Sequence, residues 1–164
     1  MGYTHYWYRT NKEHSQEKWD KFTTDFREVM DNIPDDVDLA DGGGEVPDGW
    51  VINKEEICFN GLRERSHETF RVERLPHRSR GDRGNVFSFC KTAHKEYDIM
   101  VVACLILYKY HFGAEVQISS DGDWDEWEDG LALVIDSLPD KGKEIAVEAK
   151  FTLFDDNLSR EDAS

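Results

Sequence analysis

Residues 97–112 constrain the fold more than any other segment, because their side chains are apolar almost all round. Gly113 follows at once and is placed to end a helix. A helix without a polar face belongs in the centre of a domain, where other elements cover it on every side. Its longest apolar stretch, Ile99–Leu107, is too short to cross a bilayer. The sequence therefore predicts a central buried helix in a protein that does not span a membrane.

Two amphipathic helices are predicted to pack around this centre. Ser15 can cap the first of them, and Pro34 ends it. Its apolar stripe consists of Trp19, Phe22, Phe26, Val29, Met30 and Ile33. The second lies within residues 121–138 and has the stripe Trp124, Trp127, Leu131, Val134 and Leu138. Such spacings place one apolar face of each helix against a core.

Segments in which apolar and polar side chains alternate predict strands with one buried face. These segments are Tyr3–Arg9, Trp50–Asn53, Glu56–Asn60, Thr69–Arg74, Val86–Cys90, Glu115–Ser119 and Glu144–Phe154. Residues 34–49 are expected to form a loop. Clustered strands favour an antiparallel or mixed sheet with helices on one face. We therefore expect a single α+β domain over residues 1–154, packed by about three helices, and a polar tail over residues 155–164.

The chain has a large acidic excess, since 35 acidic and 20 basic residues give a net charge of −15. The electrostatic field of such a net charge repels nucleic acid and anionic membranes and keeps a protein soluble. Three explanations fit it: adaptation to high salt, an acidic surface for a protein partner, and mimicry of a nucleic-acid backbone. Because the acidic residues are spread along the chain, adaptation to high salt explains the acidic excess slightly better than a surface for a protein partner does.

Cys58, Cys90 and Cys104 each lie in an apolar run, where a free cysteine commonly behaves as a small buried hydrophobic residue. Their spacing matches no zinc motif, so we expect neither a metal nor a cofactor. The N-terminus lacks the basic start and apolar core of a signal peptide. Together these features predict a soluble, cytoplasmic protein in a reducing compartment.

The segment Arg63–Arg83 holds seven of the ten arginines and is the only basic candidate for binding nucleic acid. Guanidinium groups bind phosphate or carboxylate through two hydrogen bonds, so this segment can dock an anionic ligand or an acidic partner. The favoured interpretation is that its arginines pair with nearby Asp and Glu, because acidic residues are in excess everywhere. Nucleic-acid binding is therefore not expected.

The acidic run Asp121–Asp129 invites comparison with a calcium loop. It is not an EF-hand, because its sixth residue is Glu126 rather than Gly and its twelfth is Ala132 rather than Glu. Acidic side chains at the start of a helix also cap free amides and complement the helix dipole. Helix capping is the favoured interpretation.

Polar residues at the ends of predicted strands and helices form the candidate ligand site, because ligands are usually held by loops at such ends. Its members are His5, Asn60, Glu68, Lys91, Thr92 and Asp98. For each of them taken singly, turn formation or helix capping is the better explanation. No catalytic set can be assigned without geometry.

Several short motifs resemble a family of uncharacterised proteins from bacteria, archaea and their viruses. The motifs are Met1–Trp7 (MGYTHYW), Ile57–Gly61, Glu68–Phe70, Phe89–Ala93, Tyr97–Asp98 and Ser119–Gly122. The resemblance implies a stand-alone domain encoded by a virus or by mobile DNA, and it carries over no activity and no site residue. The stretch Pro76–Arg83 departs from the family pattern, which weighs against a functional role for its arginines.

We therefore expect a non-enzymatic binding or regulatory protein that acts on a protein partner through an acidic surface. Two alternatives stay open. One is a small enzyme or ligand-binding protein with a polar pocket at the strand ends, and the other is a nucleic-acid mimic. The pocket requires the six polar side chains named above to meet in space.

Overall fold

The computed structural model describes residues 2–76 and 84–152, the side chain of Phe151 excepted. Its strands are β1 Thr4–Arg9, β2 Leu39–Ala40, β3 Val51–Ile52, β4 Glu56–Gly61, β5 Phe70–Glu73, β6 Val86–Lys91 and β7 Val116–Ser120. Its helices are α1 Gln16–Met30, α2 Asp98–Phe112, α3 Trp124–Ser137 and α4 Gly142–Thr152. The predicted tail 155–164 and the side chains of Arg78, Arg80 and Arg83 lie outside the described residues.

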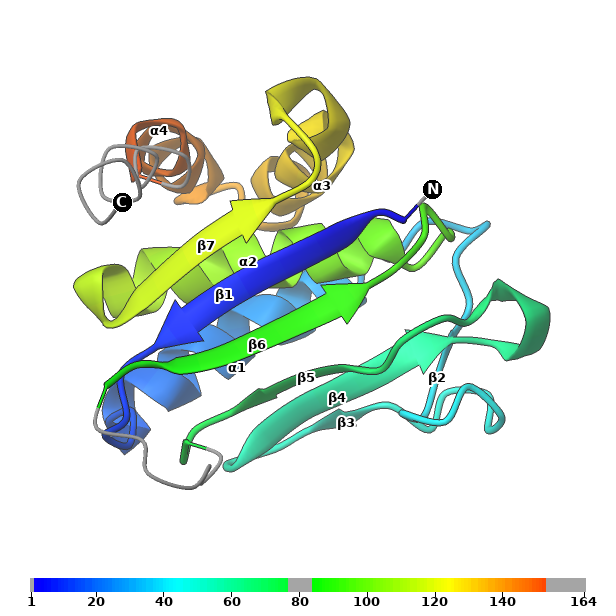
Figure 1. The fold of residues 1–164 in the computed structure, drawn as a ribbon. Helices are drawn as coiled ribbons and strands as arrows, with labels where there is room; N and C mark the ends of the chain where they lie inside the picture. Colours follow the sequence, from blue (N-terminus) through cyan, green and yellow to red (C-terminus); the bar gives the residue numbers. More distant parts are fainter. Residues whose placement is uncertain (1, 77–83, 153–164) are drawn as a thin grey trace.

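The strands form one side of the molecule and the helices the other (Figure 1). β1 is the middle strand of a three-stranded sheet in the order β6-β1-β7, whereas β4 pairs with β2, β3 and β5. Every one of these pairings is antiparallel. The expected class, an α+β domain with an antiparallel sheet packed by helices, is confirmed.

α2 is the centre of the core, as its all-round apolar sequence predicts. All nine residues from Met100 to Tyr108 are at most 1% exposed. The other three helices and β7 contact this helix. Among the described residues, no helix combines the length and the hydrophobicity that a membrane crossing requires.

α1 has the predicted amphipathic stripe. Ser15 caps the helix by accepting a hydrogen bond from the Lys18 amide at 3.2 Å. The completely buried side chains of the stripe are Trp19, Phe22, Phe26 and Val29. The sequence pattern therefore identified both the start of the helix and its buried face.

The acidic run 121–129 caps α3, as the favoured interpretation expects. Asp123 is the N-cap and accepts a hydrogen bond from the Glu126 amide at 3.2 Å. Asp121 accepts a hydrogen bond from the Thr4 amide at 3.0 Å, which ties the run to β1. These two aspartates thus have roles in the fold itself.

The predicted strand Glu144–Phe154 is wrong, because α4 occupies this part of the chain. Ile145 and Ala149 are buried, whereas Val147 between them is 58% exposed. In a strand all three would share one face, since alternate residues point the same way. A spacing of four with an exposed residue between is that of a helix, and Ala, Glu and Lys favour helices. The short strand β2 was also missed and lies within the expected loop 34–49.

Candidate functional site

Three of the six predicted site residues meet at one end of β1. His5 is completely buried on β1, and its Nε2 lies 2.7 Å from Oδ1 of Asp98. The hydroxyl of Thr92, which follows β6, donates a hydrogen bond to the same oxygen at 2.5 Å. Asp98 is the first residue of α2, and 16% of its side chain is exposed. A strand, a turn and a helix start therefore converge on one carboxylate.

Ser120, at the end of β7, extends this cluster. Its Oγ lies 2.8 Å from Nδ1 of His5 and accepts hydrogen bonds from the Gly122 amide at 2.9 Å and the Trp127 indole at 3.2 Å. Two N–H donors fill both acceptor positions of the hydroxyl, so its O–H donates to Nδ1 of His5. The other ring nitrogen then carries the proton and donates to Asp98.

The chain of Ser120, His5 and Asp98 has the order of hydroxyl, imidazole and carboxylate that serine hydrolases use. A nucleophilic serine also needs an available lone pair and a path to its substrate. Both lone pairs of Ser120 accept hydrogen bonds, so neither is available for attack, although the residue itself is partly exposed. This set, which we call the Ser120 relay, is therefore a structural network rather than a nucleophilic centre.

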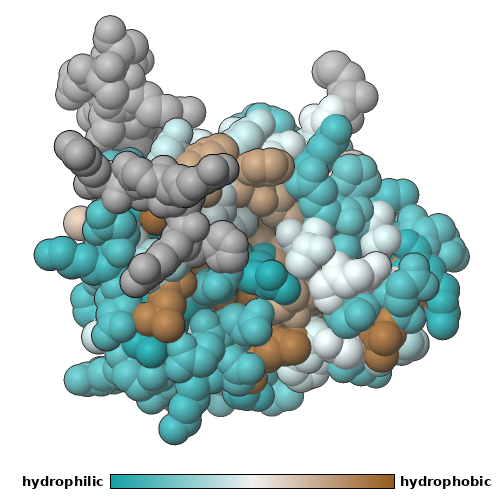
Figure 2. Space-filling model, turned by 60° about the horizontal axis from the view of Figure 1, so that its bottom comes forward, coloured by the Kyte–Doolittle hydropathy of each residue, from teal (hydrophilic) through white to brown (hydrophobic). Residues whose placement is uncertain are grey.

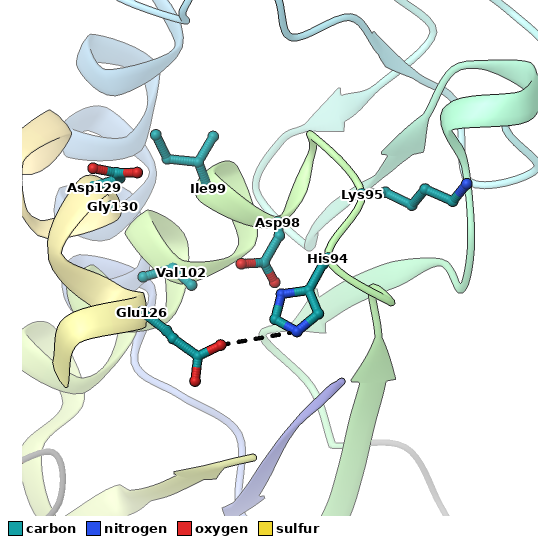
Figure 3. A pocket seen from close by; sticks show the side chains of 8 residues that line it. All are labelled: His94, Lys95, Asp98, Ile99, Val102, Glu126, Asp129 and Gly130. Carbon is teal, nitrogen blue, oxygen red and sulfur yellow. Dashed lines mark ion pairs between the residues drawn. The ribbon is translucent and has the colours of Figure 1, made fainter. Parts of the chain in front are cut away.

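A pocket of about 170 Å³ lies beside Asp98, between the starts of α2 and α3 (Figure 3). Its lining residues are His94, Lys95, Asp98, Ile99, Val102, Glu126, Asp129 and Gly130. The His94 ring points toward Glu126, with Nε2 3.8 Å from the carboxylate (Figure 3). We call it the Asp98 pocket. Of the six predicted residues, only Asp98 lines it.

The turn that leads into this pocket has an unusual backbone. Ala93 and His94 have positive φ angles of 53° and 60°, a conformation that is unfavourable for residues other than glycine. The Tyr3 ring stacks on the His94 imidazole with centroids 3.8 Å apart. The Tyr3 carbonyl also accepts hydrogen bonds from the amides of Thr92 and Ala93. Tyr3 therefore holds the turn in its left-handed conformation.

Asn60 is occupied by the fold. Its Nδ2 donates to the carbonyls of Gly42 and His67, and its Oδ1 accepts from the amides of Gly61 and His67. The residue is 2% exposed, and these four hydrogen bonds use the full capacity of an amide side chain. The sequence favoured turn formation for Asn60, but the residue lies within β4 and pairs with Ala40; its side chain instead ties the strand to the backbone at Gly42 and His67.

Glu68 and Lys91 join the two sheets. The Glu68 amide donates to the Lys91 carbonyl at 3.1 Å, and Oε2 of Glu68 accepts from the Lys91 amide at 2.8 Å. The Tyr97 hydroxyl donates to the Glu68 carbonyl at 2.6 Å. These contacts make a seam between β5 and β6, which are not paired as strands. The predicted set therefore divides into three groups: His5, Thr92 and Asp98 at one end of β1, Glu68 and Lys91 in the seam, and Asn60 by itself.

The three-stranded sheet has a second candidate site on its side away from the helices (Figure 1). Tyr6, Tyr8, Phe87 and Phe89 lie there, and the register pairs Tyr6 with Phe89 and Tyr8 with Phe87. The Phe87 ring centroid is 4.9 Å from that of Tyr8 and 5.9 Å from that of Phe89. Tyr8, Phe87 and Phe89 are 45%, 46% and 53% exposed. We call these four residues the aromatic face.

The surface in the view of Figure 2 is mostly hydrophilic, with separate hydrophobic patches. Ser119 and Gln117 on β7 pair with Tyr6 and Tyr8, so the central rows of the face carry no charge. On β4 and β5, in contrast, Glu56 and Arg71 form an ion pair at 3.3 Å. Central rows without charge are unusual in a chain of which 34% is charged.

The aromatic face was not predicted from the sequence, although a signal for it exists. Tyr6, Trp7 and Tyr8 are consecutive, and alternate residues of a strand point to opposite faces. Trp7 is 2% exposed and enters the core, so the two tyrosines must lie outside. Aromatic residues on both faces of a strand thus indicate a second apolar surface.

The described arginines of the segment Arg63–Arg83 include three with acidic partners, as the pairing interpretation expects. The pairs are Arg65–Asp38 at 3.9 Å, Arg71–Glu56 at 3.3 Å and Arg74–Glu55 at 3.4 Å. Within the described part of the chain, no group of three or more His, Cys, Asp or Glu side chains is placed to hold a metal ion.

Comparison with protein-family models, with curated proteins and with solved structures finds no match. Fold and site together define an α+β protein in which the hydrogen-bonding groups of the Ser120 relay are all paired and the aromatic face is exposed.

Proposed function

We propose that this chain is a non-enzymatic binding protein that docks to a protein partner through the aromatic face. The observation that carries the proposal is the exposure of Tyr8, Phe87 and Phe89 beside one another on one sheet. Contiguous exposed apolar groups mark interaction surfaces, because a partner that covers them removes a large apolar area from water. The saturated Ser120 relay supports a role other than catalysis.

The acidic surface belongs to the same proposal. Protein interfaces commonly combine an apolar centre, in which Tyr and Phe are enriched, with a polar rim. A net charge of −15 attracts a basic partner over a distance and repels an acidic one. A protein with a basic surface around an apolar patch is the best complement.

Nucleic acid fits the aromatic face less well. Exposed rings can stack on bases, but such sites also need cationic groups that follow the phosphates. Here the Tyr6 hydroxyl donates to the Asp121 carboxylate at 3.2 Å, so an acidic group lies at the edge of the face. Mimicry of nucleic acid, in turn, gives the exposed aromatic rings no role.

A regulatory role in the cytoplasm of a salt-adapted host, with the gene carried by a virus or mobile element, completes the proposal. It is supported by the MGYTHYW resemblance and by the dispersed acidic residues. The aromatic face supplies the contact surface that such a role needs.

The test removes the aromatic face without changing the charge. The double variant Phe87→Ser, Phe89→Ser should recover about tenfold less of any specific partner that co-purifies with the tagged protein from its own cells, because buried aromatic groups dominate interface energy. Val147→Ser on α4, where Val147 is 58% exposed, is the matched control and should recover the wild-type amount. Equal recovery by the double variant, with an unchanged circular dichroism spectrum, would contradict the proposal.

A second candidate function is binding of a small polar ligand in the Asp98 pocket. The left-handed pair Ala93 and His94 favours it, because strained backbone often lies at binding sites. Small amines and carboxylic acids should then shift the methyl NMR signals of Ile99 and Val102. A screen in which none of these compounds moves either signal removes this candidate.

A further inference from the structure

A groove of about 350 Å³ lies where α1 ends and the chain turns toward β2. Its apolar wall consists of Met30, Ile33, Pro34, Val37, Leu39 and Trp50, and its rim of Asp35, Asp38 and Asp48. We call it the Trp50 groove. It shares no lining residue with the Asp98 pocket or with the aromatic face, so it is a separate feature of the surface.

Within residues 2–76 and 84–152, the rim carboxylates have few cationic partners. Nη1 of Arg65 lies 3.9 Å from Oδ2 of Asp38, at the outer limit of an ion pair. The same nitrogen donates to the Asp36 carbonyl at 3.4 Å. Neither Asp35 nor Asp48 forms an ion pair with any described residue. The groove therefore presents negative charge that the described part of the fold does not neutralise.

The backbone fixes the position of Asp48 beside Trp50. Its φ angle is 56°, a left-handed conformation that aspartate tolerates better than most residues. Its amide donates to the Leu39 carbonyl at 3.0 Å, and the Gly49 amide donates to the Val46 carbonyl at 3.0 Å. Trp50 packs against the core while staying partly exposed. The backbone at Asp48 and the partly buried Trp50 ring are thus held in place before any partner arrives.

An apolar wall, an indole and a carboxylate rim together match one kind of occupant, a long side chain with a positive head. The methylene stem of Lys or Arg lies well against apolar groups such as Met30 and Ile33, and its positive head can meet a rim carboxylate or the Trp50 ring. A purely apolar occupant would cover the carboxylates without pairing them. A bare metal ion would make no use of the apolar wall.

We propose that the Trp50 groove receives a Lys or Arg side chain from a basic segment of a protein partner. This inference rests on the proposed function, because it gives the partner a chemical character that the acidic surface selects. The aromatic face then supplies apolar contact area, and the Trp50 groove supplies selection for a cationic residue.

The test uses three blocked peptides that are identical except for a central Lys, Arg or norleucine. Norleucine keeps the methylene stem and lacks the charge. In NMR titrations at low salt, the Lys and Arg peptides should shift the Trp50 indole and Met30 methyl signals to saturation. The norleucine peptide should not. Equal shifts with norleucine would show a simple apolar groove and would overturn the inference.

Variants of the rim sharpen the test. Asp35→Asn with Asp48→Asn should weaken binding of the Lys peptide about tenfold, which is about 1.4 kcal/mol, because the exposed ion pairs with the lysine head are lost. Asp36→Asn is the matched control, because Asp36 is exposed in the same loop and does not line the groove. Unchanged binding by the double variant, shifts spread over the whole acidic surface, or saturation of the same signals by Ca²⁺ alone would each contradict the inference.

The two proposals fail separately. Phe87→Ser with Phe89→Ser should leave binding of the Lys peptide unchanged, because these residues lie outside the Trp50 groove. If the peptides do not bind while that double variant still loses its partner, the groove inference falls and the proposed function stands. If the peptides bind while the double variant keeps its partner, the docking surface is wrong and the groove inference stands.

Discussion

Two buried histidines each connect a hydroxyl with a carboxylate, and in both cases the neighbours determine which ring nitrogen carries the proton. His5 lies between Ser120 and Asp98. His14 lies between Tyr108, whose hydroxyl is 2.7 Å from Nε2, and Glu115, whose carboxylate is 3.0 Å from Nδ1. A carboxylate can only accept, so Nδ1–H donates to Glu115 and Nε2 accepts from Tyr108.

Ser120→Ala should lower the free energy of unfolding by about 2 kcal/mol. The substitution leaves the Trp127 indole and the Gly122 amide without their acceptor, and unsatisfied buried donors carry this order of penalty. Urea unfolding measures the loss, and Ser119→Ala on the aromatic face should change stability by less than about 0.5 kcal/mol.

The same residue allows a chemical check. A fluorophosphonate probe should not label the wild-type protein, because both lone pairs of the Ser120 hydroxyl already accept hydrogen bonds. Labelling of Ser120, found by mass spectrometry and lost in Ser120→Ala, would contradict the assignment of the relay as structural.

His14 should make stability depend on pH below neutrality. Burial, and then the positive charge of Arg9, lower the pKa of His14 from 6.5 to about 4. The unfolded chain therefore binds a proton that the folded chain excludes, so the contribution is complete above pH 6.5 and is lost as the pH falls toward 4. With about 1.4 kcal/mol for each pKa unit, the loss by pH 4 is about 3 kcal/mol.

Chemical unfolding measured from pH 7 to pH 4 tests this linkage. His14→Gln should remove that part of the slope, whereas His94→Gln, at a side chain that is 60% exposed, should keep the wild-type profile. Identical slopes for wild type and His14→Gln would contradict the assignment.

At the scale of elements, the packing of α3 on α2 depends on Gly130. A Cβ at this position would lie 2.4 Å from Cγ1 of Val102, which is 1% exposed. Real side chains do not approach so closely, so glycine is required here despite its low helix propensity. This close approach also sets the distance between the two helix starts that border the Asp98 pocket.

Gly130→Ala should lower the free energy of unfolding by about 1–3 kcal/mol through overpacking. On propensity alone the change would stabilise the helix by about 0.5–1 kcal/mol. In a double-mutant cycle with Val102→Ala, the combined cost should be smaller than the sum of the two single costs. Ala132→Gly, at an exposed position of the same helix, measures the effect of helix propensity alone on stability. If the stability costs of Gly130→Ala and Val102→Ala were additive, the close contact between these two positions would be contradicted.

The spacing of apolar residues along the chain was sufficient to predict the helices whose buried side chains form a continuous pattern. The stripe of α1 and the all-round apolar sequence of α2 belong to this class. α4 was missed because Ile145, Val147 and Ala149 alternate with polar or small residues, and only contact with the core shows that Val147 lies outside. When a sequence fits both the period of a strand and the period of a helix, tertiary packing decides which of the two forms.

The site could be predicted only in part, for a similar reason. His5 and Asp98 were both named as candidates, yet Ser120, which bonds to His5 across 115 positions of the chain, was not. Such pairs depend on strand order, which alternation does not reveal. Asn60 lies near the end of β4 and Glu68 precedes β5, and the partners of both side chains are backbone groups.

For the whole molecule, the acidic excess is the main electrostatic property of the chain. A net charge of −15 is spread over the chain, and many of the ion pairs that offset it are exposed, such as Lys21 with Glu17. Repulsion among like charges destabilises a compact state, and salt screens it. We expect the loss of weak exposed ion pairs at high salt to be smaller than this gain.

The thermal midpoint should therefore rise by several degrees between 0.05 M and 1 M NaCl, as screening reduces self-repulsion. Differential scanning fluorimetry at constant pH measures it. Sucrose of matched osmolality serves as the uncharged control and separates screening from general stabilisation by solutes. A midpoint that falls with salt would show that attractive ion pairs dominate and would contradict halophilic adaptation.

Site-specific photocrosslinking tests the central claim most directly. A benzoylphenylalanine residue replaces Phe89 on the aromatic face in one protein and Val147 on α4 in the other, where the two native side chains are 53% and 58% exposed. Illumination in the protein's own cells should give a discrete protein adduct at position 89 and none at position 147. No adduct at position 89, or the same adducts at both positions, would contradict docking through the aromatic face.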